Sequence, residues 1–258
     1  MDISFVLILL ILGITAGCYG TIIGAGGGFI FVPALLLILN MEPAVAAGSG
    51  LVIVLINSIS GVFGYVKQKK IQFRVGIAIG VGAIPGSLIG VWLLQLYSSQ
   101  SFYIVFASVL LVLGVFLLTK SLPSSKQKIG ENKVSLFKES NRKFKWLLIL
   151  GFFMGILSSY LGIGGGWILV PILIYLFHVP THNATATSIF ALCIYSSVGV
   201  ASQLFYSNID WLTVIWGGFG VIIGSQVGVK LAQKIPSKVI VQMLSFVLII
   251  IGVRMYFQ

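Results

Sequence analysis

Long apolar runs, separated by short polar stretches, recur along the whole chain and predict ten hydrophobic segments. The first five cover about residues 3–23, 28–40, 45–66, 73–96 and 101–119. The second five cover about residues 146–161, 166–178, 184–206, 211–233 and 239–257. A helix that spans a bilayer needs roughly 20 apolar residues, and runs such as 51–56 lack the alternation of a membrane barrel strand. The pattern predicts an all-α polytopic membrane protein.

The longest polar stretch lies between the two sets of segments. Residues 120–145 are rich in lysine and serine and hold few large apolar side chains, which is typical of a solvated linker. We therefore predict an N-terminal membrane repeat at 1–119, a basic linker at 120–145 and a C-terminal membrane repeat at 146–258.

The two sets match each other at one constant spacing of 138 positions, the distance from Pro33 to Pro171. Glycines recur at this spacing from the first segment to the last: Gly13 and Gly151, Gly61 and Gly199, Gly86 and Gly224, Gly90 and Gly228, Gly114 and Gly252. Chance matches would not hold one offset over five segments, so the chain is an internal duplication. In the fourth segments, the glycines four positions apart predict close helix packing.

Loop charges predict how the two halves are oriented. Lys67, Lys69 and Lys70 follow the third segment, whereas the matching loop at 207–210 holds no basic residue. The next pair of loops shows the opposite bias, because 97–100 is uncharged and its counterpart carries Lys234 and Lys238. Basic loops of membrane proteins stay in the cytoplasm. We therefore predict inverted-topology repeats, with the linker cytoplasmic and both termini outside.

The second segment of each half is too short for a full crossing. About 12 residues of helix extend roughly 18 Å, against a hydrocarbon core of about 30 Å. We predict a shortened or re-entrant helix after each glycine-rich break. Whether the first two segments both span or form a re-entrant hairpin stays open, since either arrangement gives an odd number of crossings.

Composition and charge argue against a soluble protein, a nucleic-acid-binding protein and an enzyme. The chain is 58% hydrophobic and 8% charged, against about 25% charged residues in soluble domains. Its net charge of +11 comes from a few short loops, so nucleic acid is not an expected partner. We expect no metal, no cofactor and no enzymatic activity, because no ligand cluster, carboxylate pair or nucleophile–base pair lies within the segments. No segment carries a charged residue at its middle, unlike most proton- or cation-driven carriers.

A glycine-rich break occurs once in each half and is the strongest candidate for a site. Gly24, Gly26, Gly27 and Gly28 precede a short apolar segment with Pro33, and Gly162, Gly164, Gly165 and Gly166 precede one with Pro171. A helix that restarts after such a break offers free N–H groups and the positive end of its dipole. Two such ends meeting in the membrane would form an anion site without buried lysine or arginine. The alternative is that the glycines only permit close packing.

Short polar residues at the start of the third segments are further candidate ligands. Ser49 and Thr187 occupy the same repeat position, and Thr185 and Ser188 flank Thr187. On a helix, Asn57 shares a face with Ser49, and its counterpart is Tyr195. Hydroxyl and amide donors there could reach an anion. The alternative is that the hydroxyls bond to carbonyls of their own helix.

The paired motif resembles the signature of the sulfite exporter TauE/SafE family, also called the toluene-sulfonate uptake permease family. It reads Gly-x-Gly-Gly-Gly-Phe-Ile-x-Val-Pro from Gly24 and Gly-x-Gly-Gly-Gly-Trp-Ile-x-Val-Pro from Gly162. The resemblance covers the chain apart from the linker, and it implies a carrier of small sulfur-containing anions in a prokaryotic inner membrane. A second motif of the family, usually Gly-Thr-Ser, has the counterparts Gly48-Ser49-Gly50 and Ala186-Thr187-Ser188 in this chain. The first half therefore lacks one hydroxyl.

We therefore expect a carrier for a small anion, such as sulfite, thiosulfate or sulfoacetate, that works by alternating access. The lipid bilayer and the anion are its expected partners, and its oligomeric state is open. Two alternatives remain at this point. One is an anion channel with a continuous pore, and the other is a membrane assembly subunit without cargo.

Overall fold

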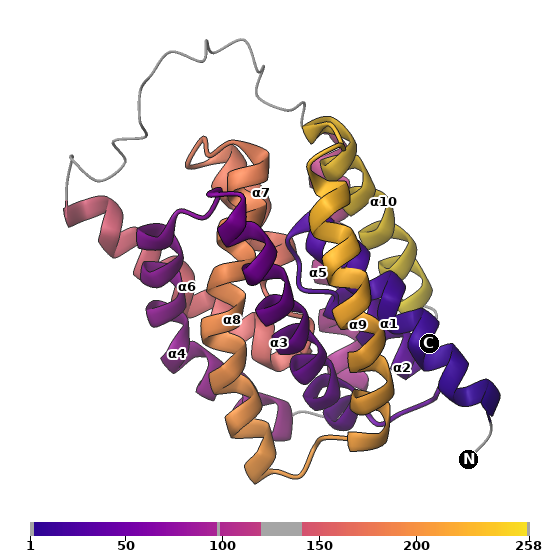
Figure 1. Cartoon of the computed structure of the whole chain (residues 1–258). Helices are drawn as coiled ribbons and strands as arrows, with labels where there is room; N and C mark the ends of the chain where they lie inside the picture. Colours follow the sequence, from indigo (N-terminus) through magenta and orange to yellow (C-terminus); the bar gives the residue numbers. More distant parts are fainter. Residues whose placement is uncertain (1–2, 97–98, 120–140, 257–258) are drawn as a thin grey trace.

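The computed structural model describes residues 3–96, 99–119 and 141–256 and places ten α-helices there (Figure 1). Their bounds are α1 Ile3–Ile23, α2 Gly28–Leu37, α3 Pro43–Lys67, α4 Phe73–Leu96, α5 Ser99–Thr119, α6 Asn141–Leu161, α7 Gly166–Tyr175, α8 Thr181–Phe205, α9 Trp211–Ala232 and α10 Ser237–Tyr256. The prediction of an all-helical chain with ten segments is confirmed. Most of the predicted linker, residues 120–140, lies outside the described residues.

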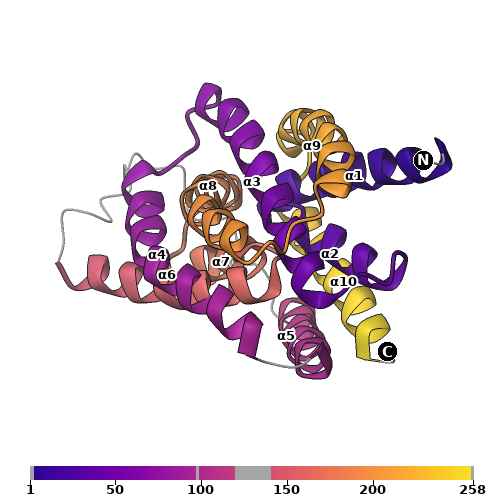
Figure 2. The same cartoon turned by 90° about the horizontal axis from the view of Figure 1, so that it is seen from below.

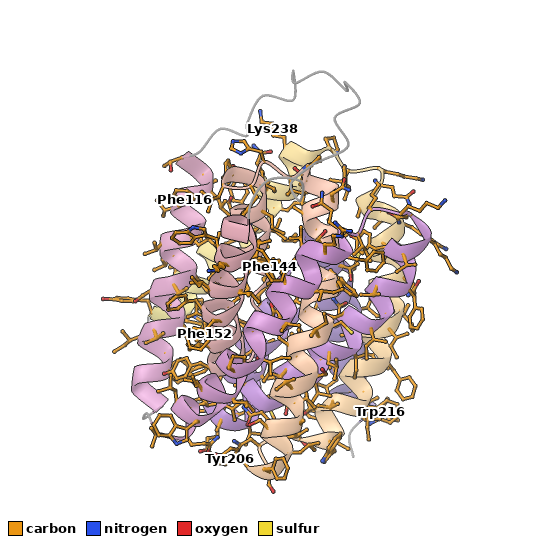
Figure 3. All side chains as sticks on the ribbon, turned by 90° about the vertical axis from the view of Figure 1, so that its left-hand side faces the viewer. Phe116, Phe144, Phe152, Tyr206, Trp216 and Lys238 are labelled. Carbon is orange, nitrogen blue, oxygen red and sulfur yellow. The ribbon has the colours of Figure 1, made fainter. Side chains whose placement is uncertain are left out.

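Eight of the ten helices are long and apolar enough to cross a membrane, and α2 and α7 are shorter. With 10 residues each, α2 and α7 extend about 15 Å. Large apolar side chains such as Val112 and Ile250 remain exposed on the outside of the bundle, as expected of a surface that faces lipid. Lys238 and Tyr206 lie at opposite ends of the bundle (Figure 3). The fold is that of a polytopic membrane protein.

Helix ends differ from the predicted bounds by a few residues. The helix α6 begins at Asn141 rather than 146, and α3 begins at Pro43 rather than 45. The basic residues at the start of α6 continue the helix before the apolar stretch begins, so hydropathy alone places its start too late. Pro43 is compatible with a first helical position because it needs no N–H partner there.

The two halves of the chain are interlocked. The helix α1 packs along α9 of the other half, and α6 packs along α4. Viewed along the bundle, α4 and α6 lie on one side, α1 and α9 on the other, and α3 and α8 between them (Figure 2). The last helices of the two halves, α5 and α10, pack against each other. These three inter-half contacts thus recur with the halves exchanged.

Glycines allow these helices to approach closely, as the spacing in the fourth segments predicts. A Cβ atom on Gly82 of α4 would lie 2.8 Å from the Cα of Leu148 in α6. At the equivalent position of α9, a Cβ atom on Gly220 would lie 3.0 Å from the backbone nitrogen of Ile14 in α1. Both gaps are too small for a side chain, so the backbones themselves form the contact.

The central helices α3 and α8 run in opposite directions. The start of α8 meets the end of α3, where Asn183 Nδ2 donates to the Lys70 carbonyl at 3.0 Å. The start of α3 meets the end of α8, where the Asp210 amide donates to Ser49 Oγ at 2.9 Å. This pair of equivalent helices therefore points in opposite directions, and inverted repeats of the two whole halves stay a prediction. How the halves are oriented in a membrane stays a prediction.

Candidate functional site

The first break follows α1 and has a backbone that only glycine adopts readily. Gly24, Gly26 and Gly27 have φ angles of +86°, +83° and +79°, in the left-handed region that costs other residues about 1–2 kcal/mol each. The amides of Gly24, Ala25 and Gly26 donate to the Gly20 carbonyl at 2.9, 2.8 and 3.2 Å. The chain thereby turns back on itself before α2 begins at Gly28.

The second break resembles the first but differs at one residue. Gly162 and Gly164 have φ angles of +71° and +73°, close to those of their counterparts. Gly165, the counterpart of Gly27, has a φ angle of −83°. Its amide donates to the hydroxyl of Tyr195 at 3.1 Å. Residues on α8 thus take part in the second break.

The two breaks lie in direct contact inside the bundle. A Cβ atom on Gly28 would lie 2.8 Å from the Cα of Ile163, and one on Gly166 would lie 2.8 Å from the Cα of Ala25. All residues of both breaks are buried. The duplicated motif therefore brings the starts of α2 and α7, one from each half, to a common centre.

Two apolar side chains fill the space beside the breaks. Val54 of α3 and Leu192 of α8 occupy the same repeat position, and both lie against Gly26 and Gly164. Neither was among the predicted site residues. An apolar side chain in an apolar segment gives no local signal, and only the repeat spacing pairs these two positions.

Several buried donors near the breaks have no acceptor among the described residues. The amides of Gly27, Gly28 and Phe29 at the start of α2 are in this group, as are those of Ile163, Gly164 and Gly166 at the start of α7. Among buried side chains, Asn57 Nδ2, Ser159 Oγ and Trp167 Nε1 also have no partner. The first N–H groups of a helix have no acceptor within it, and buried polar groups are normally hydrogen-bonded, so these donors are open to water or to a ligand.

The same region holds no charge. Within the described parts of the chain, no Asp, Glu, Lys, Arg or His is buried. An acceptor that enters the site would meet neutral N–H and O–H donors, together with the positive ends of two helix dipoles. This chemistry favours an anion over a cation.

The predicted hydroxyl ligands occupy different places. Ser188 Oγ lies at the first break and donates to the Gly24 carbonyl at 2.8 Å. Thr185 lies beside Gly24, but its hydroxyl donates to the Thr181 carbonyl of its own helix at 3.0 Å. In the first half, Gly50 takes the place of Ser188 against the Gly162 carbonyl, so the missing hydroxyl leaves that carbonyl without this donor.

Ser49 and Thr187 take part in two equivalent contacts at opposite ends of α3 and α8. Thr187 Oγ1 accepts from the Gln72 amide at 3.0 Å, as Ser49 Oγ accepts from the Asp210 amide. We call these contacts the Thr187 clasp and the Ser49 clasp. Each joins a central helix of one half to a loop of the other half.

Asn57 lies one helical turn after Val54 and next to the end of α1. Its Oδ1 accepts from Thr21 Oγ1 at 3.0 Å. The structure thus brings Ser188 to a glycine of the first break and Asn57 to Thr21, near the end of α1, whereas Ser49 and Thr187 contact loops. Sequence reasoning missed Thr21, Ser159 and Trp167, which become relevant only when α1, α6 and α7 are packed around the breaks.

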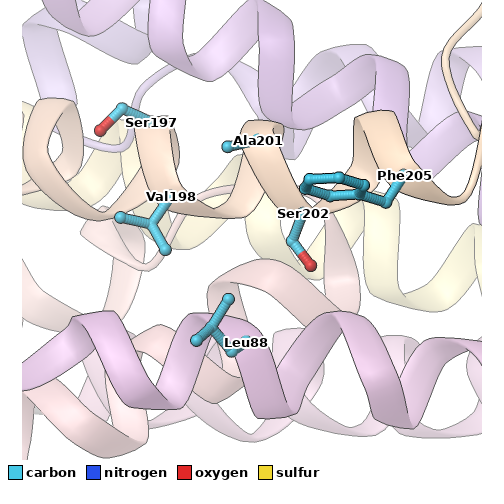
Figure 4. A pocket seen from close by; sticks show the side chains of 6 residues that line it. All are labelled: Leu88, Ser197, Val198, Ala201, Ser202 and Phe205. Carbon is cyan, nitrogen blue, oxygen red and sulfur yellow. The ribbon is translucent and has the colours of Figure 1, made fainter.

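A separate shallow pocket lies between α4 and α8 (Figure 4). It is lined by Leu88, Ser197, Val198, Ala201, Ser202 and Phe205. Leu88 and Phe205 are exposed on the outer surface of the bundle, and none of the six residues belongs to a break. This pocket is not the predicted site.

The fold and the site together define a polytopic membrane protein in which two short helices, each preceded by a glycine-rich break, begin at an internal centre. Helix starts at such a centre are typical of secondary transporters. The chain matches the family described as "Sulfite exporter TauE/SafE" over residues 9–255. It belongs to this family and is a membrane transporter.

Relatives share the length of this chain. It is 29% identical to the "Probable membrane transporter protein YunE" of Bacillus subtilis, over 99% of this chain and 98% of the relative. It is 28% identical to the "Probable membrane transporter protein MJ0441" of Methanocaldococcus jannaschii, with the same two coverages. No solved structure matches the chain.

Proposed function

We propose that this transporter carries a small anion, a sulfur-containing oxyanion or an organosulfonate, and binds it where the two breaks meet. The observation that supports this proposal is the set of buried donors without acceptors at the starts of α2 and α7, in a region without buried charge. Oxyanions have several acceptor oxygens and match such a donor set. The family description, a sulfite exporter, points to the same class of cargo.

We propose alternating access rather than a continuous pore. Val54 and Leu192 fill the space beside the breaks, and the two clasps join the halves at both ends of the central helices. An open path to one side requires that one clasp separates while the other holds. This favours a carrier over a channel, in which both ends would be open together.

Close contacts between the halves suggest which parts would move. Rocking of residues 1–119 against residues 146–258 would pull α1 from α9 and α6 from α4, where glycines allow backbone contact. We therefore propose that each moving unit contains helices of both halves, one built on α1 and α9 and the other on α4 and α6.

Binding is tested with a thermal-shift panel on the purified protein. Sulfite, thiosulfate, sulfate, an organosulfonate, a carboxylate and sodium are compared at fixed ionic strength. A ligand at 100 times its Kd stabilises the folded state by about 2.7 kcal/mol. We expect one or more sulfur oxyanions or sulfonates to raise the melting temperature. The proposal fails if only a cation or a neutral solute does so.

Transport is tested in proteoliposomes with radiolabelled thiosulfate. A carrier exchanges labelled substrate against unlabelled substrate on the other side, so we expect saturable uptake that accelerates when the vesicles are preloaded. Flux that neither saturates nor responds to preloading would instead indicate a channel.

A further inference from the structure

Asn57 and Tyr195 occupy equivalent positions but differ in what they do at the breaks. Their backbones are held alike, because Ser225 Oγ donates to the Asn57 carbonyl at 3.4 Å and Ser87 Oγ donates to the Tyr195 carbonyl at 3.3 Å. Both side chains are fully buried. The difference between the halves therefore lies in the side chains and not in the helices that carry them.

In the second half, the donor at the break already has an acceptor. The Tyr195 hydroxyl accepts from the Gly165 amide at 3.1 Å. A Cβ atom on Gly165 would lie 2.9 Å from this hydroxyl oxygen, so the tyrosine directly covers the residue before α7. The Tyr195 oxygen thus takes the place that an oxygen of an anion would occupy.

In the first half, the corresponding donor is free. Asn57 is shorter than tyrosine, its Oδ1 is bonded to Thr21, and its Nδ2 has no acceptor. The Gly27 amide has no acceptor among the residues that the structure describes. Asn57 stands at the repeat position that Tyr195 holds beside the second break, and its buried Nδ2 is a donor without an acceptor.

We propose that the transporter binds one anion at the first break, with Asn57 Nδ2 and the Gly27 amide among its donors, while the Tyr195 hydroxyl occupies the second break in place of a second anion. This inference rests on the proposed anion carrier. It assigns Asn57 as a ligand residue and Tyr195 as the residue that limits the site to one anion. A second like charge in the same buried region would otherwise meet the first across the contact between the breaks.

The test is calorimetric titration of the purified protein with thiosulfate. The wild-type protein should bind one anion. Tyr195→Phe removes the acceptor of the Gly165 amide with little change in shape, and it should either add a second binding event or raise the affinity at least threefold. Asn57→Asp keeps the shape but puts a carboxylate in place of the donor, and it should weaken binding at least tenfold.

Two further variants distinguish the loss of a ligand residue from a general loss of folding. The exchange Asn57→Tyr with Tyr195→Asn moves the proposed site from the first break to the second. We expect Asn57→Tyr alone to bind poorly and the double exchange to bind one anion again. Each variant is first checked for a single symmetric peak in gel filtration.

The outcomes separate the two proposals. If the wild-type protein binds no anion in any assay, the proposed function fails and this inference fails with it. If it binds thiosulfate but Asn57→Asp binds equally well, or Tyr195→Phe changes neither affinity nor stoichiometry, the anion site stands and the assignment of these two residues is wrong.

Discussion

Val54 and Leu192 lie against the same glycine at the centre of the molecule. A Cβ atom on Gly164 would be 3.0 Å from Val54 Cγ1 and 2.9 Å from Leu192 Cδ2. The two residues come from equivalent positions in α3 and α8, so one apolar side chain from each half reaches the contact between the breaks. Any ligand that binds there must share this space with them.

The first prediction concerns the volume at this contact. Val54→Leu adds a methylene group to a position with 0% exposure, and overpacking of this kind costs about 1–3 kcal/mol. We expect a lower melting temperature and at least a fivefold weaker affinity for thiosulfate. The matched control is Val112→Leu, the same change at a position with 71% exposure on α5, which should alter neither quantity. Normal binding by Val54→Leu would place the ligand elsewhere.

The second prediction compares the two glycines that precede α2 and α7. Gly27→Ala forces alanine into a φ angle of +79°, and its Cβ atom would lie 2.8 Å from the Ala16 carbonyl oxygen. The left-handed backbone alone costs about 1–2 kcal/mol. Gly165 has a φ angle of −83°, which alanine adopts freely, and its nearest neighbour is the end of the Tyr195 side chain. We expect Gly27→Ala to lower the melting temperature more than Gly165→Ala, and equal losses would contradict the difference between the breaks.

Much of the fold could be predicted from the sequence because the bilayer imposes strong patterns. Long and short apolar runs indicated ten segments, and the constant spacing of glycines identified the two halves. Glycines four apart in the fourth segments indicated close packing, which the contacts at Gly82 and Gly220 confirm. These features depend on neighbours along one helix or on the repeat itself.

The site could be predicted only in part, because its details depend on contacts between the halves. The glycine motif located the breaks, but Tyr195 gains a role only when its hydroxyl reaches Gly165, thirty positions away in the sequence. Ser49 shares a face with Asn57 on one helix, yet its hydroxyl contacts the Asp210 amide of the other half. Periodicity predicts which face a residue occupies and not which segment packs against that face.

The third prediction uses two glycines of α9 that are two positions apart. Gly220 faces α1, where a Cβ atom would lie 3.0 Å from the Ile14 backbone nitrogen, whereas Gly218 meets only the flexible end of Ile56. Alanine is favoured over glycine in a helix interior by about 1 kcal/mol. We expect Gly218→Ala to be neutral or stabilising and Gly220→Ala to be destabilising in thermal unfolding. The reverse order would show that α1 and α9 are not in backbone contact.

The last prediction tests the orientation of the repeats in a membrane. Lys67 and Phe205 are equivalent positions at the ends of α3 and α8, and both side chains are exposed. The basic loop after α3 should lie in the cytoplasm and the loop after α8 outside. In a background with Cys18 and Cys193 replaced by alanine, we introduce Lys67→Cys or Phe205→Cys and label whole cells with a membrane-impermeant maleimide. Phe205→Cys should react in intact cells and Lys67→Cys only after the cells are opened. Labelling of both from the same side would contradict inverted repeats. Two antiparallel helices that both cross the membrane must end on opposite sides of it.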